Sequence, residues 1–276
     1  MRTSQPLPSS RTAMKREARA IRRAAVGTHH DPEVLNDLSS RLIFELFSGS
    51  GRLAKACSRI GFSTKTFDWM DNKEQDFLDD SQYFEMCKLV RQRKISLLWI
   101  GIPCCTWSRA RRTGGGPPQL RSDRSPMGWP DLKGKRRATI KLHNKILYRV
   151  VELVLLCKDC GVDWVIENPE SSRIWLTKPM KSVLSWSTFF NLDFCQYGER
   201  WRKRTSFATS IASLSSLSRL CRSSGRYPNC SRTQKRHIQL SGADPITKQF
   251  RTMLACPYPK QLVRAFASAV ARHYVG

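Results

Sequence analysis

Residues 95–104 read Ile-Ser-Leu-Leu-Trp-Ile-Gly-Ile-Pro-Cys, an apolar run that ends in a proline and a cysteine. The run predicts a strand over 95–100, because short, unbroken apolar runs are typical of strands buried on both faces. A cysteine kept for packing would lie within the strand or on a helix face. Cys104 instead follows the strand, at the edge where a parallel sheet opens into its ligand crevice. We therefore interpret Cys104 as a nucleophile and the adjacent Cys105 as structural.

Other strands and helices alternate around this run. Strands are predicted at 42–47, 62–67 and 162–166, and helices at 52–60, 82–93 and 139–160. The alternation predicts an α/β fold with a doubly wound, mostly parallel sheet. Beyond residue 169 the pattern weakens. We expect a helix over 172–186, a strand over 188–194, and a helix over 262–274 that packs back on the sheet.

The charge balance points to a polyanionic partner. The chain of 276 residues has 48 Lys and Arg against 22 Asp and Glu, a net charge of +26. Nucleic acid is the first partner to consider. A membrane is disfavoured, because the positive charge is spread over loops and no apolar run is long enough to span a bilayer. Ten cysteines without regular spacing, and no secretory signal, favour an intracellular, reduced protein.

A glycine-rich turn follows the first predicted strand. It reads Phe47-Ser48-Gly49-Ser50-Gly51, and the start of the next helix favours a carboxylate or phosphate beside it. Asp68 closes the second strand, where an acid can bind the hydroxyl groups of a ribose. Together they suggest an adenosine-bearing cofactor. A plain turn and a strand-end cap are the alternatives.

Glu167 ends the strand predicted at 162–166. A carboxyl group there is partly desolvated, which raises its pKa and enables it to donate a proton; a strand-end cap is the alternative. The loop 108–137, rich in Arg, Gly and Pro, follows Cys104. We interpret it as a cationic cover whose arginines lower the pKa of the Cys104 thiol. The alternative is a disordered basic insertion.

In this order, the turn, Asp68, Pro103-Cys104 and Glu167-Asn168 resemble the motifs of the cytosine carbon-5 DNA methyltransferases, which use S-adenosylmethionine. The resemblance implies a Rossmann-like methyltransferase fold with a small C-terminal annex. It implies a catalytic set of Cys104, Glu167, Arg202 and Arg204. The implied cofactor-binding set is Phe47, Ser48, Gly49, Gly51, Asp68, Asp76 and Pro103. The residues expected to bind nucleic acid are Arg109, Arg111, Arg112, Gln196 and Arg200.

The resemblance also implies a covalent mechanism. The Cys104 thiolate adds to carbon 6 of cytosine, Glu167 protonates ring nitrogen 3, and carbon 5 takes the methyl group. The base must first be flipped out of a duplex. Cys105 stands where the family has Gln, Pro169 stands where it has Val, and Cys256-Pro257-Tyr258-Pro259 occupies the place of its Gly-Asn-Ser-Val. These departures keep two alternatives open, an RNA cytosine methyltransferase and a copy that binds nucleic acid without turnover.

The predicted organisation has four parts. They are a basic, disordered arm over 1–37, a methyltransferase catalytic domain over 38–208, a small target-recognition or insertion region over 209–256, and a C-terminal helix within 257–276. From the charge we expect a nuclear location if the source is eukaryotic, with an organelle as the alternative, and a monomer. Cys221, Cys230 and His237 are candidate zinc ligands. Their spacing is not that of a standard finger and a fourth ligand is not evident, so no metal site is assigned.

Overall fold

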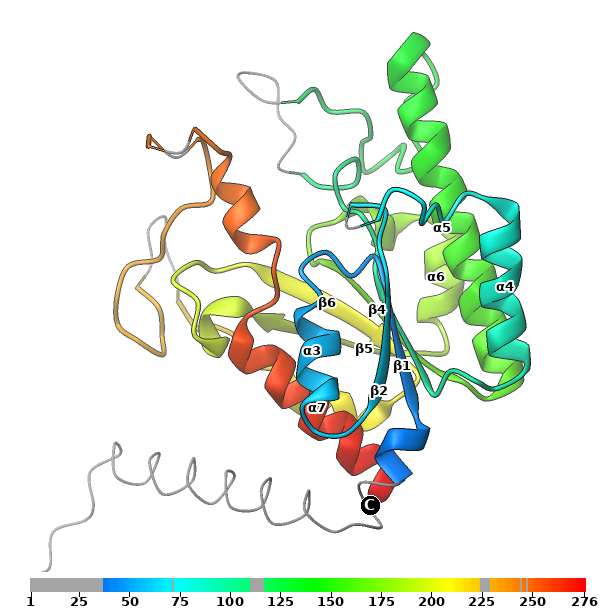
Figure 1. The fold of residues 1–276 in the computed structure, drawn as a ribbon. Coiled ribbons are helices and arrows are strands. Elements are labelled where there is room, and N and C mark those ends of the chain that lie inside the picture. Colours follow the sequence, from blue (N-terminus) through cyan, green and yellow to red (C-terminus); the bar gives the residue numbers. More distant parts are fainter. Residues whose placement is uncertain (1–36, 71, 110–116, 224–228, 244, 247) are drawn as a thin grey trace, which may run out of the picture.

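The computed structural model describes residues 37–276 except 71, 110–116, 224–228, 244 and 247. One six-stranded sheet has the order β2-β1-β3-β4-β6-β5, and only β6 runs against the other strands (Figure 1). The predicted α/β fold with a doubly wound, mostly parallel sheet is confirmed. The basic arm lies outside the described residues. The strands are β1 (Leu42–Leu46), β2 (Ser63–Phe67), β3 (Leu97–Gly101), β4 (Asp163–Pro169), β5 (Thr188–Asp193) and β6 (Arg204–Thr209).

Helices cover both faces of the sheet. Figure 1 shows α4 (Asp80–Arg91), α5 (Gly134–Cys160) and α6 (Lys178–Leu184) on one face. On the other face, α3 (Arg52–Ser58) and α7 (Lys260–Val275) pack side by side. The described helices all fall short of the combined length and apolar character that a membrane crossing requires.

Two hydrophobic cores lie between these layers. In β3, the side chains of Leu98 and Ile100 enter the core beneath α4, α5 and α6, while Trp99 enters the core beneath α3 and α7. This follows from the strand geometry, because successive side chains point to opposite faces. A strand buried on both faces is therefore read from an unbroken apolar run, as the sequence predicts.

The strand order creates a switch point between β1 and β3. The chain leaves β1 through α3 to reach β2 on one side, and then crosses through α4 to β3 on the other. Loops at the carboxyl ends of β1 and β3 therefore turn away from each other and leave a crevice, where open α/β sheets bind their ligands. The turn after Leu46 and the Pro-Cys pair after Gly101 lie at this crevice.

Three elements differ from expectation. The helix expected over 172–186 is a short 3-10 helix η1 (Arg173–Leu176) followed by α6, because Thr177 caps a new helix by accepting from the Met180 amide. Helix α5 begins at Gly134, before the predicted residue 139. Strand β6 was not predicted, since its sequence of Arg, Thr and Ser lacks an apolar run. The remaining short elements are η2 (Phe194–Tyr197), η3 (Ala212–Leu217) and η4 (Arg251–Ala255).

Candidate active site

Cys104 and Glu167 lie at the same edge of the sheet. Gly101 of β3 pairs with Glu167 of β4, and Cys104 follows three positions after Gly101. The loop between them is fixed, because Asn168 donates from Nδ2 to the carbonyl oxygen of Ile102 at 2.7 Å. Burial is the main cause of the raised pKa of the Cys104 thiol, and Glu167 is close enough to raise it as well. The predicted nucleophile and the predicted proton donor are thus brought together.

Glu167 is a buried carboxyl group with few partners. Burial raises its pKa, and the positive charge of Lys203 and a hydrogen bond from Tyr258 oppose that rise. The Tyr258 hydroxyl donates to Oε2 at 3.2 Å, and Lys203 Nζ lies 3.8 Å from Oε1. Within the described part of the chain, Oε1 has no hydrogen-bond partner. A carboxyl group with a raised pKa and a free oxygen is suited to hold a proton and donate it.

The pKa of the Cys104 thiol is raised to about 11. Burial is the largest cause, Lys203 lowers the pKa, and Glu167 raises it. The arginines expected to lower this pKa do not all contact the thiol. Arg109 forms an ion pair with Asp123 at 2.7 Å and donates to the carbonyl oxygen of Ser171, whereas Arg111 and Arg112 lie outside the described residues. Among the described cations, Lys203 acts most strongly on the thiol.

A network of buried side chains holds the segment after Cys104. The Arg121 side chain is fully buried, lies 3.3 Å over the Trp107 ring, and donates to Thr106 Oγ1. It also donates to Asn144 of α5 at 2.9 Å. Cys105 Sγ lies 3.3 Å from Nε2 of His143 on the same helix. These contacts give Cys105 a structural partner, and they fix the chain next to Cys104.

The glycine-rich turn has a strained backbone at the end of β1. Phe47, Gly49 and Gly51 have φ angles of 59°, 51° and 58°. A left-handed conformation is unfavourable for a bulky residue such as Phe47, and such strain concentrates at functional sites. The Ser48 hydroxyl is buried without a hydrogen-bond partner among the described residues. A ligand at this turn would supply the missing partner.

Asp68 and Asp76 lie around this turn. Asp68 Oδ2 accepts from the Gly49 amide at 2.7 Å, and Oδ1 accepts from the Met70 amide at 2.7 Å. Each carboxylate oxygen can accept a further hydrogen bond, so ribose hydroxyls can still be bound. Asp76 is exposed and adjoins Phe77, whose ring packs edge-on against Phe47 at 5.1 Å. The turn and both acids therefore fit the adenosine part of S-adenosylmethionine.

Gly101 marks the point where the two halves of the site meet, and it is not among the residues predicted from the sequence. A Cβ atom at this position would lie 3.2 Å from the Tyr258 hydroxyl oxygen and 3.3 Å from the Phe47 carbonyl oxygen. Glycine is needed there because the backbone of β3 passes so close to both groups. Pro103 lies two positions later, directly before Cys104, and is half-buried.

The predicted arginine pair has another partner. Arg204 donates to both carboxylate oxygens of Asp193 at 3.2 and 3.0 Å, and Arg202 Nε lies 3.6 Å from the same fully buried carboxylate. Lys203, between them, points to Glu167, as alternation along an extended chain requires. Arg202 and Arg204 therefore pair with Asp193, whereas Lys203 lies beside Glu167. The alternation in this basic run was the available signal for Lys203.

Two further predicted residues contact residues 218–256, a segment called the annex from here on. Gln196 Nε2 contacts Cys195 Sγ at 3.5 Å and Ser231 Oγ at 3.4 Å. Arg200 is exposed, and its carbonyl oxygen accepts from the Ile238 amide. Neither contact tests a role in nucleic-acid binding, which stays a prediction.

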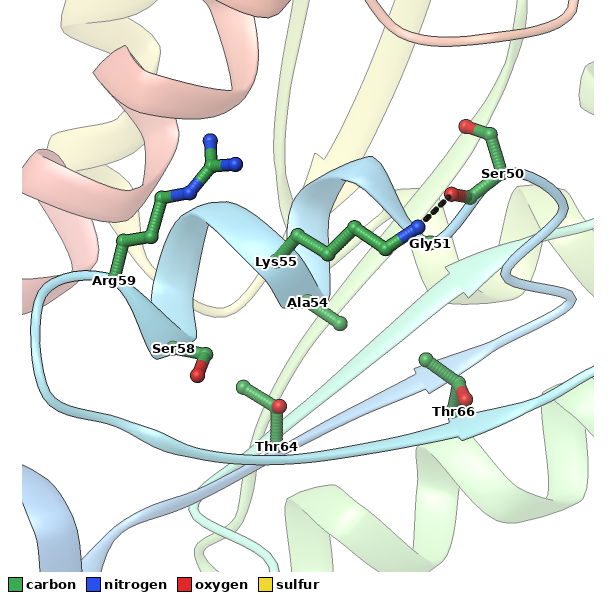
Figure 2. Close-up of a pocket in the computed structure, with 8 residues that line it drawn as sticks. All are labelled: Ser50, Gly51, Ala54, Lys55, Ser58, Arg59, Thr64 and Thr66. Atoms are coloured by element: carbon green, nitrogen blue, oxygen red, sulfur yellow. Dashed lines mark hydrogen bonds between the residues drawn. The ribbon is translucent and has the colours of Figure 1, made fainter.

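A separate groove of about 520 Å³ lies between α3 and β2 (Figure 2). Lys55 of α3 reaches back along it to donate to the Ser50 carbonyl oxygen. The groove shares Ser50 and Gly51 with the glycine-rich turn but is not lined by Cys104 or Glu167. It is therefore distinct from the predicted catalytic crevice. Its lining residues are Ser50, Gly51, Ala54, Lys55, Ser58, Arg59, Thr64 and Thr66.

Comparison with known proteins adds a distant structural likeness. No family model and no curated protein matches the chain. Among solved structures, it is similar to the S. pombe Dnmt2 methyltransferase at 14% identity and a TM-score of 0.35. The match covers 61% of this chain and 50% of that one, so the chain spans half the length of this neighbour. A likeness this distant carries no weight for activity or substrate, which rest on the residues described above.

Proposed function

We propose that the chain is an S-adenosylmethionine-dependent methyltransferase that acts on carbon 5 of cytosine in DNA. The observation that carries the proposal is the pairing of Gly101 with Glu167, which brings a thiol and a buried carboxyl group to one edge of the sheet. The strained turn with its unpartnered Ser48 hydroxyl lies across the adjoining switch point. A nucleophile, a proton donor and a cofactor turn are the three parts that this chemistry requires.

Each side chain of the site has a separate role in the proposed reaction. Cys104 adds through sulfur to carbon 6 of the flipped cytosine, and Glu167 donates its proton to ring nitrogen 3 as negative charge develops there. S-adenosylmethionine, when bound, supplies the methyl group that carbon 5 accepts. A water molecule then accepts the carbon-5 proton, the electrons of that C–H bond re-form the double bond between carbons 5 and 6, and Cys104 leaves as a thiolate. Ring nitrogen 3 returns its proton to Glu167, which completes the cycle. Phe47, Ser48, Asp68 and Asp76 would hold the cofactor.

Lys203 and Tyr258 position Glu167 and set its protonation. Both lower the pKa of the Glu167 carboxyl, and Lys203 also lowers that of the Cys104 thiol. The thiol, with a pKa of about 11 before binding, must lose its proton as the substrate enters. Further positive charge near the sulfur in the complex would favour the thiolate.

The net charge of +26 supports a nucleic-acid substrate. Lys and Arg release counterions when they neutralise phosphates, so binding should weaken steeply with salt. DNA is favoured from the resemblance, and RNA is the alternative substrate. A nuclear location if the source is eukaryotic, with an organelle as the alternative, stays a prediction.

A second candidate function is nucleic-acid binding without turnover. Two observations favour it: the high pKa of the Cys104 thiol, and the engagement of Arg202 and Arg204 by Asp193. The chemistry proposed above requires a thiol with a lowered pKa, and both features disfavour such a thiol.

Methyl transfer decides between these functions. The wild-type chain, Cys104→Ser and Cys105→Ser are incubated with methyl-labelled S-adenosylmethionine and either DNA or RNA. We expect label in DNA with the wild type and Cys105→Ser, and at least about 10³-fold less with Cys104→Ser. Label in RNA alone would identify the other substrate. Binding without label in either polymer would favour the second function.

A further inference from the structure

Four potential metal ligands converge at the base of the annex, away from the candidate active site. One sulfur or nitrogen atom of each lies within 4.8 Å of all the others, and all four side chains are buried. The residues are Cys195, Cys221, Cys230 and His237. In a tetrahedral zinc site with Zn–S distances of about 2.3 Å, sulfur atoms lie about 3.8 Å apart. The Cys221 sulfur and His237 Nε2 already lie 3.8 Å apart.

We propose that these four residues form a structural zinc site that ties the annex to the central sheet. Three cysteines and one histidine are a donor set that closed, structural zinc sites use. The sequence offers Cys221, Cys230 and His237, but the fourth ligand comes from η2, before β6. Only the fold brings Cys195 to the others, which is why the spacing along the chain does not resemble a standard finger.

The three sulfur atoms form a cluster apart from both hydrophobic cores. Buried thiols usually pack among apolar side chains, whereas the buried cluster here consists of cysteines alone. Polar hydrogens also point at the sulfurs. The Ser231 amide donates to Cys221 Sγ at 3.4 Å, and Gln196 Nε2 lies 3.5 Å from Cys195 Sγ. Such outer hydrogen bonds are typical of metal ligands, since they orient them.

The described residues of the annex form no hydrophobic core that could hold it without a metal. Over the described part of 218–256, the buried residues are Cys221, Cys230, His237 and Ala255. Its larger apolar side chains, such as Phe250 and Met253, are more than half exposed at 53% and 56%. Segments with so little buried apolar area need disulfides or a metal to fold. A bound zinc ion supplies that folding free energy directly.

The local backbone is shaped to present two of the ligands. Between Cys230 and His237 the chain forms a tight turn, in which the Gln234 amide donates to the Cys230 carbonyl oxygen and the Cys230 amide donates to that of Lys235, both at 2.8 Å. Gln234 takes a left-handed φ of 58° to make this turn.

The site links the annex to elements that reach Glu167. Cys195 lies on η2, directly after β5, and Arg202 donates to Ser223 of the annex. Farther along the annex, the Ala255 carbonyl oxygen accepts from Lys203, the cation beside Glu167. The sequence of the annex, residues 218–256, carries eight Lys and Arg against one Asp. A zinc ion would therefore order a basic surface next to the crevice.

The first test is the metal content of the full chain purified without added chelator. We expect about one zinc per chain for the wild type and for Cys160→Ser, a matched control in which a partly buried cysteine outside the cluster is changed. We expect at least about fivefold less zinc per chain in each of three variants, Cys195→Ser, Cys221→Ser and Cys230→Ser. A folded, zinc-free wild type that does not take up added zinc would overturn the proposal.

The second test works even if the variants fail to fold. Wild-type chain is stripped with a chelator and reloaded with cobalt. We expect one equivalent to restore a thiolate-to-cobalt charge-transfer band and to protect the annex, but not the sheet, from limited proteolysis. No such band, or a disulfide between two of the three cysteines by mass spectrometry, would contradict the site. Methyl transfer is not measured, so failure of the proposed function leaves this result unaffected.

Discussion

The Tyr258 hydroxyl, just before α7, donates to Glu167 Oε2 at 3.2 Å. The same hydroxyl accepts from Trp99 Nε1 at 3.2 Å, so it links the core beneath α7 to the candidate proton donor. The segment that carries Tyr258 was expected to take the place of a missing family motif. Its contact with Glu167 indicates that this segment positions the carboxyl group.

Tyr258→Phe tests this link. The change removes the donor that lowers the pKa of Glu167 and leaves Trp99 Nε1 without its partner. We expect the apparent pKa of Glu167 in a pH–rate profile to rise, because the carboxylate loses a hydrogen bond. Stability should fall by about 1–3 kcal/mol, the cost of a buried unpaired donor. An unchanged profile together with unchanged stability would show that the hydroxyl has no such role.

Lys203→Met tests the electrostatics of the thiol. Lys203 lowers the pKa of both Cys104 and Glu167, so its removal should raise both. The measurement is the rate at which iodoacetamide alkylates Cys104 as a function of pH, read by peptide mass spectrometry. Arg202→Met is the matched control, since it removes the same charge from the neighbouring residue that pairs with Asp193. Equal effects of the two variants would contradict a specific role for Lys203.

Glu167→Gln tests the cost of burying the carboxyl group. Because its folded-state pKa lies above the ordinary value of 4.5, the native chain binds more protons than the unfolded chain in the window above that value. Stability must therefore fall as pH rises through that window. We expect the variant to lose this component of the pH dependence of thermal stability, and to lose methyl transfer.

The exposed neighbour Glu170 offers the control. Glu170→Gln removes a carboxyl group two residues beyond Asn168 at an exposed position. It should keep the wild-type dependence of stability on pH. A wild-type dependence in Glu167→Gln as well would show that Glu167 is not held protonated by burial.

Gly101→Ala tests the close approach of β3 to the turn and to Tyr258. The added Cβ atom would meet two oxygen atoms at 3.2 and 3.3 Å, one of them in the backbone of Phe47. We expect a loss of about 1–3 kcal/mol in the free energy of unfolding, as for other overpacked sites. Gly134→Ala is the comparison, because its Cβ meets open space and only its φ of +52° is unfavourable. Chemical denaturation measures both, and a smaller loss for Gly101→Ala would contradict the packing.

The sheet and the central pair of residues could be read from the sequence for a simple reason. Buried parallel strands are unbroken apolar runs, and the ends of neighbouring strands meet at one edge, so Cys104 and Glu167 were expected together. Strand β6 has no such run, so its sequence does not mark it as a strand. Its pairing with β4 depends on the whole fold. Lys203 and Tyr258 reach Glu167 only through that pairing and through the packing of α7.

The same reasoning explains why Lys203, between Arg202 and Arg204, is the residue that points to Glu167. A motif read as a string assigns its arginines to the site, but alternate side chains of an extended chain point in opposite directions. Both arginines form ion pairs with the fully buried Asp193 carboxylate, whereas the side chain of the intervening lysine points to the crevice. Cys195 is likewise found only in three dimensions, since nothing in its local sequence marks it as a ligand.

The most direct test of the central claim is covalent capture. A DNA duplex with 5-fluorocytosine in place of cytosine is incubated with the chain and S-adenosylmethionine, because fluorine at carbon 5 prevents the step that releases the enzyme sulfur. We predict a stable protein–DNA adduct that maps to Cys104, forms with Cys105→Ser, and is absent with Cys104→Ser. An adduct that maps to another residue, or no adduct under conditions where DNA is bound, would contradict the assignment of Cys104 as the nucleophile.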